Sequence, residues 1–319
     1  MCLVALAIDQ DRRFPLIVAA NRDEFFKRPA ARLGWWAPQP GDAPILAGRD
    51  LEGGGTWMGM TGQGRFALVT NRRDPRRIDP EAPSRGQIVP NWLAAREPID
   101  RFWMRTALSG YNGFNLIAAD FRLGECFWAS NVEAHPKRLE RGLYGLSNAV
   151  LDTPWPKVVR LKAQMRAAIG SAMTVDDLAA RLFAALADRT AADDEALPAT
   201  GLPLELERQL SSAFIRTADQ AYGTRCSTLV ITERARRHLI THVLERSFSP
   251  SGGLALLRRS VIRHWPPRYS EDAAGIDAEI GAVSDAELLS DSGATTPARK
   301  TRVRSLLKPA MPRRARGAV

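Results

Sequence analysis

Cysteine is scarce in this chain of 319 residues, which has three cysteines, Cys2, Cys126 and Cys226, far apart in the sequence. An odd number of cysteines without a C-x-x-C pair excludes a disulfide framework and the usual zinc knuckle. Such sparing use of cysteine is typical of a reducing compartment. We therefore expect a cytoplasmic protein.

Long apolar runs are also missing, since no window approaches the ~18 consecutive uncharged apolar residues that a membrane span needs. The first residues lack the positive flank, the long apolar region and the cleavage site of a secretory signal. Apolar residues make up 45% of the chain and charged residues 25%, as in ordinary globular proteins. The composition predicts a globular protein without an integral membrane segment, beginning at residue 1 or 2.

Nucleic-acid motifs are absent, although the formal net charge is +10. Residues 254–319 carry twelve Lys or Arg against seven Asp or Glu, so half of the excess lies in the last fifth of the chain. The remaining +5 is spread over residues 1–253 as a mildly basic surface. No RNP, helix-turn-helix or zinc-finger pattern accompanies the charge, and we expect no nucleic-acid partner.

The chain has no regular β-α-β alternation, no G-x-G-x-x-G after a first strand and no phosphate-binding loop, which argues against a dinucleotide-binding fold. Short apolar runs separated by Gly-rich or polar turns predict antiparallel strands instead. Helical spacing of apolar residues predicts two adjacent helices, with Thr174 as the N-cap of the second. The class is α+β in layers. The predicted strands are 3–8, 16–20, 45–49, 56–61, 65–70, 114–120, 125–130, 143–147, 225–231 and 238–247, and the predicted helices are 157–169 and 175–187.

Composition changes after residue 251, where Ser-Gly-Gly is followed by a Pro pair, an acidic stretch and an Arg-rich end. We expect a domain over residues 1–253 and a basic, flexible C-terminal tail over residues 254–319. The short apolar run 254–262 is compatible with a docking helix, but a weakly ordered tail is favoured.

Cys2 is the most informative residue, because removal of Met1 would leave a thiol and a free α-amine on the same residue. The unperturbed pKa of an α-amine is roughly 7.7 to 8.0, so it can take a proton from a nearby thiol near neutral pH. The alternative is that position 2 carries no function. Asn21, Arg22, Asp23 and Glu24 follow the second strand, and the hairpin brings them beside Cys2; a solvated ion cluster at a strand end is the alternative there.

Several separate blocks, in order along residues 1–250, resemble the NRDE family, which includes the transport and Golgi organisation proteins. The blocks are Met1-Cys2, AANRDEF (19–25), GGTW (54–57), TN (70–71), YNGFNL (111–116), GLSN (145–148) and YGTR (222–225). The resemblance implies an N-terminal-nucleophile hydrolase-like fold, a four-layer αββα sandwich of two antiparallel sheets between helix layers. The distant relatives of this family are choloylglycine hydrolases and penicillin V acylases.

By this resemblance Cys2 would attack a carbonyl, Asp23 would hold the α-amine, Arg22 would lie under the thiolate, and Arg225 would tune the cluster. Asn71 and Asn148 would donate to the oxyanion, although both positions also suit a structural Asx cap. Arg22 and Asp23 are closer together than in the amidases, so the division of roles among Asn21, Arg22 and Asp23 stays open. The implied substrate-binding residues are Asn21, Glu24 and Trp57.

Other polar residues give weaker signals. His238 and His242 are four apart on a predicted strand, too far apart for routine chelation, so we expect no metal site. Gly53-Gly54-Gly55 beside Trp57 either lets a ligand approach the backbone or forms a strained turn. Cys126 is expected in the core.

Two functions follow as hypotheses. The first is a hydrolase that cleaves a linear amide or related acyl bond through a Cys2 thioester, without a cofactor. The second is a binding and trafficking protein for haem or for acyl-CoA and other lipids, a function linked to members of the resembled family, with no C-x-x-C-H haem-attachment motif in the chain. The expected partner is therefore a small acyl or amide substrate, or a haem or lipid ligand. The oligomeric state is not readable from the sequence.

Overall fold

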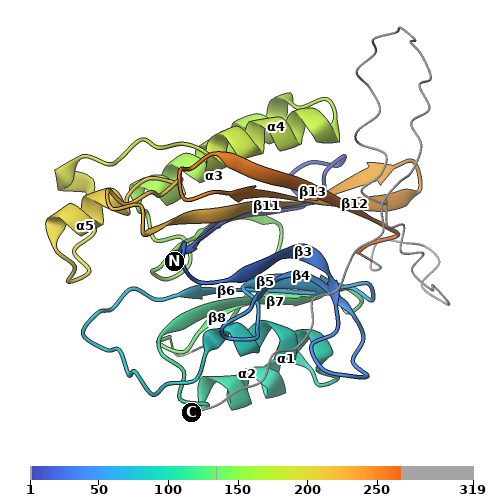
Figure 1. Ribbon diagram of the computed structural model, residues 1–319. Coiled ribbons are helices and arrows are strands. Elements are labelled where there is room, and N and C mark those ends of the chain that lie inside the picture. The colour runs from blue at the N-terminus through green and yellow to red at the C-terminus, as the bar shows by residue number, and fades with distance from the viewer. Residues whose placement is uncertain (1, 134, 267–319) are drawn as a thin grey trace, which may run out of the picture. The chain divides into compact units, whose positions relative to one another are not determined.

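Two antiparallel sheets pack face to face, and helices cover both outer faces (Figure 1). This computed structural model describes residues 2–133 and 135–266. Within them, the first sheet has the spatial order β10 (Gly142–Leu146), β1 (Cys2–Ile8), β2 (Leu16–Phe25), β11 (Tyr222–Ala235), β12 (His238–Phe248) and β13 (Leu254–Arg263). The second sheet has the order β3 (Ala30–Trp36), β4 (Ile45–Asp50), β5 (Met58–Thr61), β6 (Arg65–Asn71), β7 (Phe114–Asp120), β8 (Glu125–Ser130) and β9 (Lys137–Arg138).

The helices form two outer layers and a separate short piece. Helices α3 (Pro156–Ser171) and α4 (Val175–Leu186) cover the first sheet, and α1 (Ile88–Ala94) and α2 (Ile99–Ala107) cover the second (Figure 1). Helix α5 (Leu204–Gln209) lies in the connection from α4 to β11, and two short 3-10 helices span Arg85–Gln87 and Asp194–Ala196.

An apolar core fills the space between each pair of adjacent layers. Because successive side chains of a strand point to opposite faces of the sheet, one strand contributes side chains to two cores. In β1, Leu3 and Ala5 pack against α3 and α4, whereas Val4 and Leu6 pack between the sheets. A third core, around Trp92, joins the second sheet to α1 and α2. Three cores between four layers confirm the expected αββα sandwich.

Local signals account for the two predicted helices. The Thr174 hydroxyl accepts a hydrogen bond from the Asp177 N–H at 3.1 Å, so Thr174 caps α4 as expected. Pro156 opens α3, where a missing N–H costs nothing. Helices α1, α2 and α5 and strands β3 and β9 were not predicted.

The sheet continues beyond the expected domain boundary at residue 253. Strand β13 pairs with β12 along its length: Arg263 lies opposite Ile240 at one end, and Leu254 lies opposite Phe248 at the other. Ile262 enters the core between the sheets. Just after it, Trp265 is fully buried and its indole N–H donates to the Thr61 carbonyl at 2.9 Å. The favoured weakly ordered tail, like the docking helix, is wrong for residues 254–263, because these residues form an edge strand that is hydrogen-bonded to β12. Residues 267–319 lie outside the described residues.

Candidate functional site

Strand β2 carries the polar residues that the sequence singled out, and it runs five residues further than the predicted strand. Asn21 to Glu24 therefore lie within the strand, where successive side chains point to opposite faces. Asn21 faces the helix layer, since its Nδ2 donates to the Leu186 and Ala213 carbonyls, both at 2.8 Å. The Ser227 hydroxyl donates to the Asn21 Oδ1 at 2.5 Å. Asn21 thus joins β2 to α4 and to the segment before β11, away from the cavity described next.

The register of the first sheet brings the predicted residues together. Cys2 is the first residue of β1 and pairs directly with Arg22 of β2. On the other side of β2, Thr224 of β11 pairs with Asp23. Three neighbouring strands therefore bring Cys2, Arg22, Asp23 and Thr224 to the same end of the sheet.

A cavity of about 340 Å³, which we call the polar cavity, opens at this end of the sheets. Its walls come from β2, from the turn between β4 and β5, from the end of β6 and from the connection between β6 and α1. Of the residues predicted for the site, Arg22, Asp23, Glu24, Trp57 and Asn71 line it, whereas Asn21, Asn148 and Arg225 do not. The other lining residues are Arg28, Asp50, Thr56, Val69, Ile78, Asp79, Pro80, Ala82, Pro83, Ser84, Arg85, Gly86 and Asn112.

Arg22 is buried, with a side chain that is 5% exposed. Its guanidinium lies over the Trp57 ring, 4.3 Å from the centroid, and its Nη2 is 3.3 Å from the Asp50 Oδ2. The Arg22 Nη1 is buried and has no hydrogen-bond partner among the residues that the structure describes. An unused donor on a buried cation is costly, and it indicates a place where a ligand oxygen or a thiolate would be stabilised.

Two carboxylates near Arg22 have pKa values that are shifted in opposite directions. Burial raises the pKa of Asp23 above its ordinary value, although the Thr224 hydroxyl donates to its Oδ1 at 2.7 Å and favours the ionised form. Burial also acts to raise the pKa of Asp50, but bonds from the Arg28 guanidinium and the Gly53 N–H hold it below its ordinary value. Asp50 is therefore a fixed negative charge, while Asp23 is a group whose charge depends on a neighbouring cation.

Asn71 and Asn148 occupy different places, although the family resemblance implies the same role for both. Asn71, at the end of β6, lines the polar cavity. Asn148 is 1% exposed, and its Nδ2 donates to the Asn71 carbonyl at 2.8 Å. The Asn148 amide thus links the segment after β10 to the end of β6 and positions Asn71.

Arg225 lies at a β-bulge, between the pairs Thr224–Asp23 and Cys226–Arg22. Its Nη1 donates to the carbonyls of Phe25 and Arg28, at 2.7 and 2.8 Å. Burial lowers the pKa of Arg225, and the nearby positive charge of Arg22 acts in the same direction. Arg225 thus holds the turn after β2 and adds positive potential beside Arg22.

The Gly53-Gly54-Gly55 turn has a backbone explanation. Gly54 has a φ of +73°, which suits glycine, and a Cβ at Gly55 would lie 2.1 Å from the Gly86 carbonyl oxygen. The Gly86 carbonyl accepts a hydrogen bond from the Thr56 N–H at 2.9 Å. The close approach is therefore between two segments of the chain, and it fixes the wall of the polar cavity.

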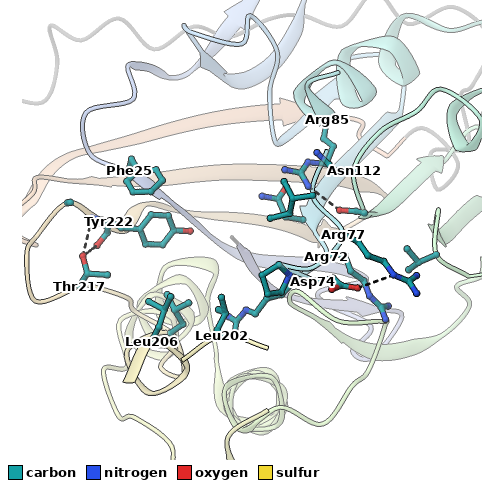
Figure 2. Close-up of a pocket in the computed structure, with 18 of the residues that line it drawn as sticks. Phe25, Arg72, Asp74, Arg77, Arg85, Asn112, Leu202, Leu206, Thr217 and Tyr222 are labelled. Atoms are coloured by element: carbon teal, nitrogen blue, oxygen red, sulfur yellow. Dashed lines mark hydrogen bonds and ion pairs between the residues drawn. The ribbon is translucent and has the colours of Figure 1, made fainter. Parts of the chain in front are cut away.

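A second cavity of about 600 Å³, which we call the large cavity, adjoins the first and shares Asn71, Ile78, Arg85 and Asn112 with it. Figure 2 shows Phe25, Tyr222, Leu202 and Leu206 on one side of the large cavity and Arg72, Arg77 and Arg85 on the other. Sequence reasoning missed this cavity. The run Arg72-Arg73-Asp74-Pro75-Arg76-Arg77, directly after a predicted strand, was the available signal.

Fold and site together define a class: a four-layer α+β protein in which buried Arg22 and Asp23, on the strand beside β1, line a polar cavity. The chain belongs to the Transport and Golgi organisation 2 family, whose family model matches residues 1–250. The resemblance of the sequence blocks to this family, which is also called the NRDE family, is thereby confirmed.

Known relatives agree with this assignment. The Transport and Golgi organization protein 2 homolog of Bos taurus is 35% identical over 253 residues, which cover 73% of this chain and 89% of that protein. The Mus musculus homolog is 32% identical with the same coverage. A solved structure, the Caenorhabditis elegans ortholog of N-acylethanolamine-hydrolyzing acid amidase, is similar with a TM-score of 0.41 and 9% identity, covering 72% of this chain and 92% of that one. In the described part of the chain, no helix has the length and apolar character to cross a membrane.

Proposed function

We propose that this protein is a hydrolase that cleaves a linear amide or related acyl bond, with Cys2 as nucleophile after removal of Met1. One observation carries the proposal: β1 and β2 pair Cys2 with Arg22, next to buried Asp23, and both Arg22 and Asp23 line a cavity, where the Arg22 Nη1 has no partner among the described residues. A buried cation beside a cysteine favours the thiolate, which is the nucleophilic form.

The proposed reaction has two steps. The Cys2 thiol gives its proton to the α-amine while the sulfur bonds to the acyl carbon. The C–N bond of the substrate then breaks. The amine part of the substrate leaves with the proton that the α-amine of Cys2 had accepted, and a thioester on Cys2 remains. Water subsequently attacks the thioester, releasing the carboxylic acid and restoring the thiol.

The residues around the cavity have distinct roles in this proposal. Asp23, the buried carboxylate on β2, orients the α-amine, and Arg22 stabilises the thiolate or the oxyanion. The Asn71 amide donates to the oxyanion, and Asn148 is a positioning residue that acts through Asn71. Glu24 and Trp57 contact the substrate, and Arg225 raises the positive potential at Arg22.

The test begins with the intact mass of the purified protein, which reports whether Met1 is removed. The protein is then incubated with a small β-lactone, an acyl electrophile, and the added mass is mapped to a residue. We expect one acyl group on Cys2, and no acylation in Cys2→Ala. Cys126→Ala is the matched control, because Cys126 is buried in the core between the sheets and burial raises the pKa of its thiol to about 12.

Two outcomes would contradict the hydrolase. Retention of Met1 would remove the free α-amine of Cys2 and with it the proposed base. Acylation that persists in Cys2→Ala, in a protein with an unchanged circular dichroism spectrum, would assign the nucleophile to another residue.

Binding and transfer of a lipid without turnover is the second candidate, and the apolar wall of the large cavity favours it. Haem iron is commonly held by His, Cys, Met or Tyr. Of these residue types, Tyr222 alone lines either cavity within residues 3–133 and 135–266. A Soret band after mixing with haem would support haem carriage, and its absence together with lipid binding would support the lipid.

A further inference from the structure

We propose that the large cavity binds the acyl chain of the substrate on its leucine wall and a negatively charged group on its arginine wall. This inference rests on the proposed function and deepens it. The substrate class is an amphipathic acyl compound that combines an aliphatic chain with a carboxylate or a phosphate. The volume of about 600 Å³ lies within the range of ligand pockets, roughly 300 to 1,000 Å³.

The two cavities adjoin each other and share lining residues, including Asn71 of the candidate site. Asn71, Arg85 and Asn112 border both of them, as does Ile78. A carbonyl held at Asn71 in the polar cavity can therefore belong to a molecule whose remainder lies in the large cavity. This continuity connects the large cavity to the chemistry proposed for Cys2.

The apolar wall comes from the segment around α5 and from two strand ends. Leu202, Leu206 and Leu210 lie along the α5 segment. Phe25 and Tyr222 lie on the same side of the cavity as Leu202 and Leu206 (Figure 2). The two rings pack edge to face with centroids 5.1 Å apart. Since this wall offers mainly carbon atoms, the ligand part that contacts it is a hydrocarbon chain.

The opposite wall is basic. The Arg72 Nη1 is buried, and it has no hydrogen-bond partner among the described residues; the Glu133 Oε1 is 3.8 Å away. The Arg77 Nε is likewise 3.8 Å from the Asp74 Oδ2, beyond hydrogen-bond distance. These guanidinium groups retain donors for a ligand carboxylate or phosphate, which they bind with two parallel hydrogen bonds.

The acidic residues on the wall do not cancel this charge. Asp219 accepts hydrogen bonds from the Thr217 hydroxyl at 2.6 Å and the Ala221 N–H at 3.0 Å. Asp74 is shared by Arg76 and Arg77. The cavity lining holds four arginines, Arg72, Arg73, Arg77 and Arg85, against the two aspartates Asp74 and Asp219, so positive charge remains in excess.

Both walls are fixed within the protein. Arg73 forms an ion pair with Glu207 of α5, and both side chains are buried, which ties the helix to the arginine segment. The Asp79 N–H donates to the Asn112 Oδ1, and the Asn112 Nδ2 donates to the Asp79 carbonyl, both at 2.8 Å. A cavity with walls fixed in this way binds without first ordering them, which favours affinity.

The experiment uses the full chain with Cys2→Ala, so that binding is measured without turnover. Displacement of a fluorescent fatty acid gives the affinities of saturated alkanoates with 6, 8, 10 and 12 carbons, of alkyl phosphates and of the corresponding alcohols. We expect about fourfold tighter binding for each added methylene until the wall is covered. The carboxylates and phosphates should bind more tightly than alcohols of equal length.

Matched variants locate the two walls. Leu206→Trp should weaken alkanoate binding about tenfold by filling the cavity, whereas Leu204→Trp on the exposed side of α5 should not change it. Arg72→Gln should weaken alkanoate binding about tenfold and leave the alcohols unchanged. Arg76→Gln, next to the cavity but outside its lining, is the charge control.

The outcomes separate this inference from the proposed function. Affinity that does not depend on chain length, or equal effects of Leu206→Trp and Leu204→Trp, would overturn the acyl-chain assignment. Equal effects of Arg72→Gln on acids and alcohols would overturn the anion assignment. If binding follows the expected pattern but wild-type Cys2 is never acylated, the cavity assignment holds and the hydrolase fails.

Discussion

Asp23 determines how the candidate site responds to pH. Because burial raises its pKa, the folded protein holds the Asp23 proton more tightly than the unfolded chain does. Stability from this group is therefore greatest below the unfolded value of 3.8 and is lost as pH rises through the folded pKa. The carboxylate is kept at a cost to stability, which is common for groups that serve a reaction.

Asp23→Asn should remove this cost. The stability of the variant relative to wild type should increase as pH rises from about 4, by about 1.4 kcal/mol for each unit by which the pKa is raised. Urea unfolding between pH 4 and 8 measures the difference, and Cys2 acylation in the same variant should be lost. Asp50→Asn is the control of opposite sign: because the pKa of Asp50 is lowered, that variant should be less stable than wild type throughout pH 4 to 8, by an amount that does not grow with pH in this range. A relative stability of Asp23→Asn that stays flat with pH would contradict the assignment.

The residues at the sheet end could be predicted from the sequence because strand pairing places them. Cys2, Arg22 and Asp23 lie on two strands joined by a short turn, so their proximity follows from the hairpin. Arg72, Arg85 and Leu206 could not be predicted in this way. They come from connections between elements, and their meeting depends on the buried Arg73–Glu207 pair and on tertiary packing.

At the scale of elements, short apolar runs between turns predicted most strands, and helical spacing of apolar residues after the Thr174 cap predicted α4. These signals failed for β13, an edge strand whose side chains are largely exposed. Its sequence, with three Arg among apolar residues, therefore resembled a tail. Long-range pairing with β12 decided its structure.

Strand β13 should be required for stability. A chain ending after residue 253 removes Ile262 and Trp265 from the core between the sheets, and losing one buried Trp typically costs about 3 to 5 kcal/mol. A chain ending after residue 266 keeps both. We expect the shorter chain to unfold at much lower urea concentration than the longer one and the full chain. Equal midpoints for all three would show that β13 contributes nothing.

The whole molecule should unfold as one unit, because the core between the sheets takes residues from both of them. The described residues, 2–133 and 135–266, also fall within a single compact unit. We expect urea transitions followed by far-ultraviolet circular dichroism and by near-ultraviolet circular dichroism to coincide. Clearly separated transitions would mean that one sheet with its helices unfolds independently.

The place of β1 has a consequence for the order of events during synthesis. Strand β1 pairs with β10, and its partner β2 pairs with β11, so the sheet around Cys2 is incomplete until residue 235 has been made. At roughly 5 to 20 residues per second, the ribosome needs on the order of ten seconds or more to reach that point. The N-terminal segment is thus open to an aminopeptidase before the strands around β1 have paired, and the strand topology leaves time for the maturation on which the proposed nucleophile depends.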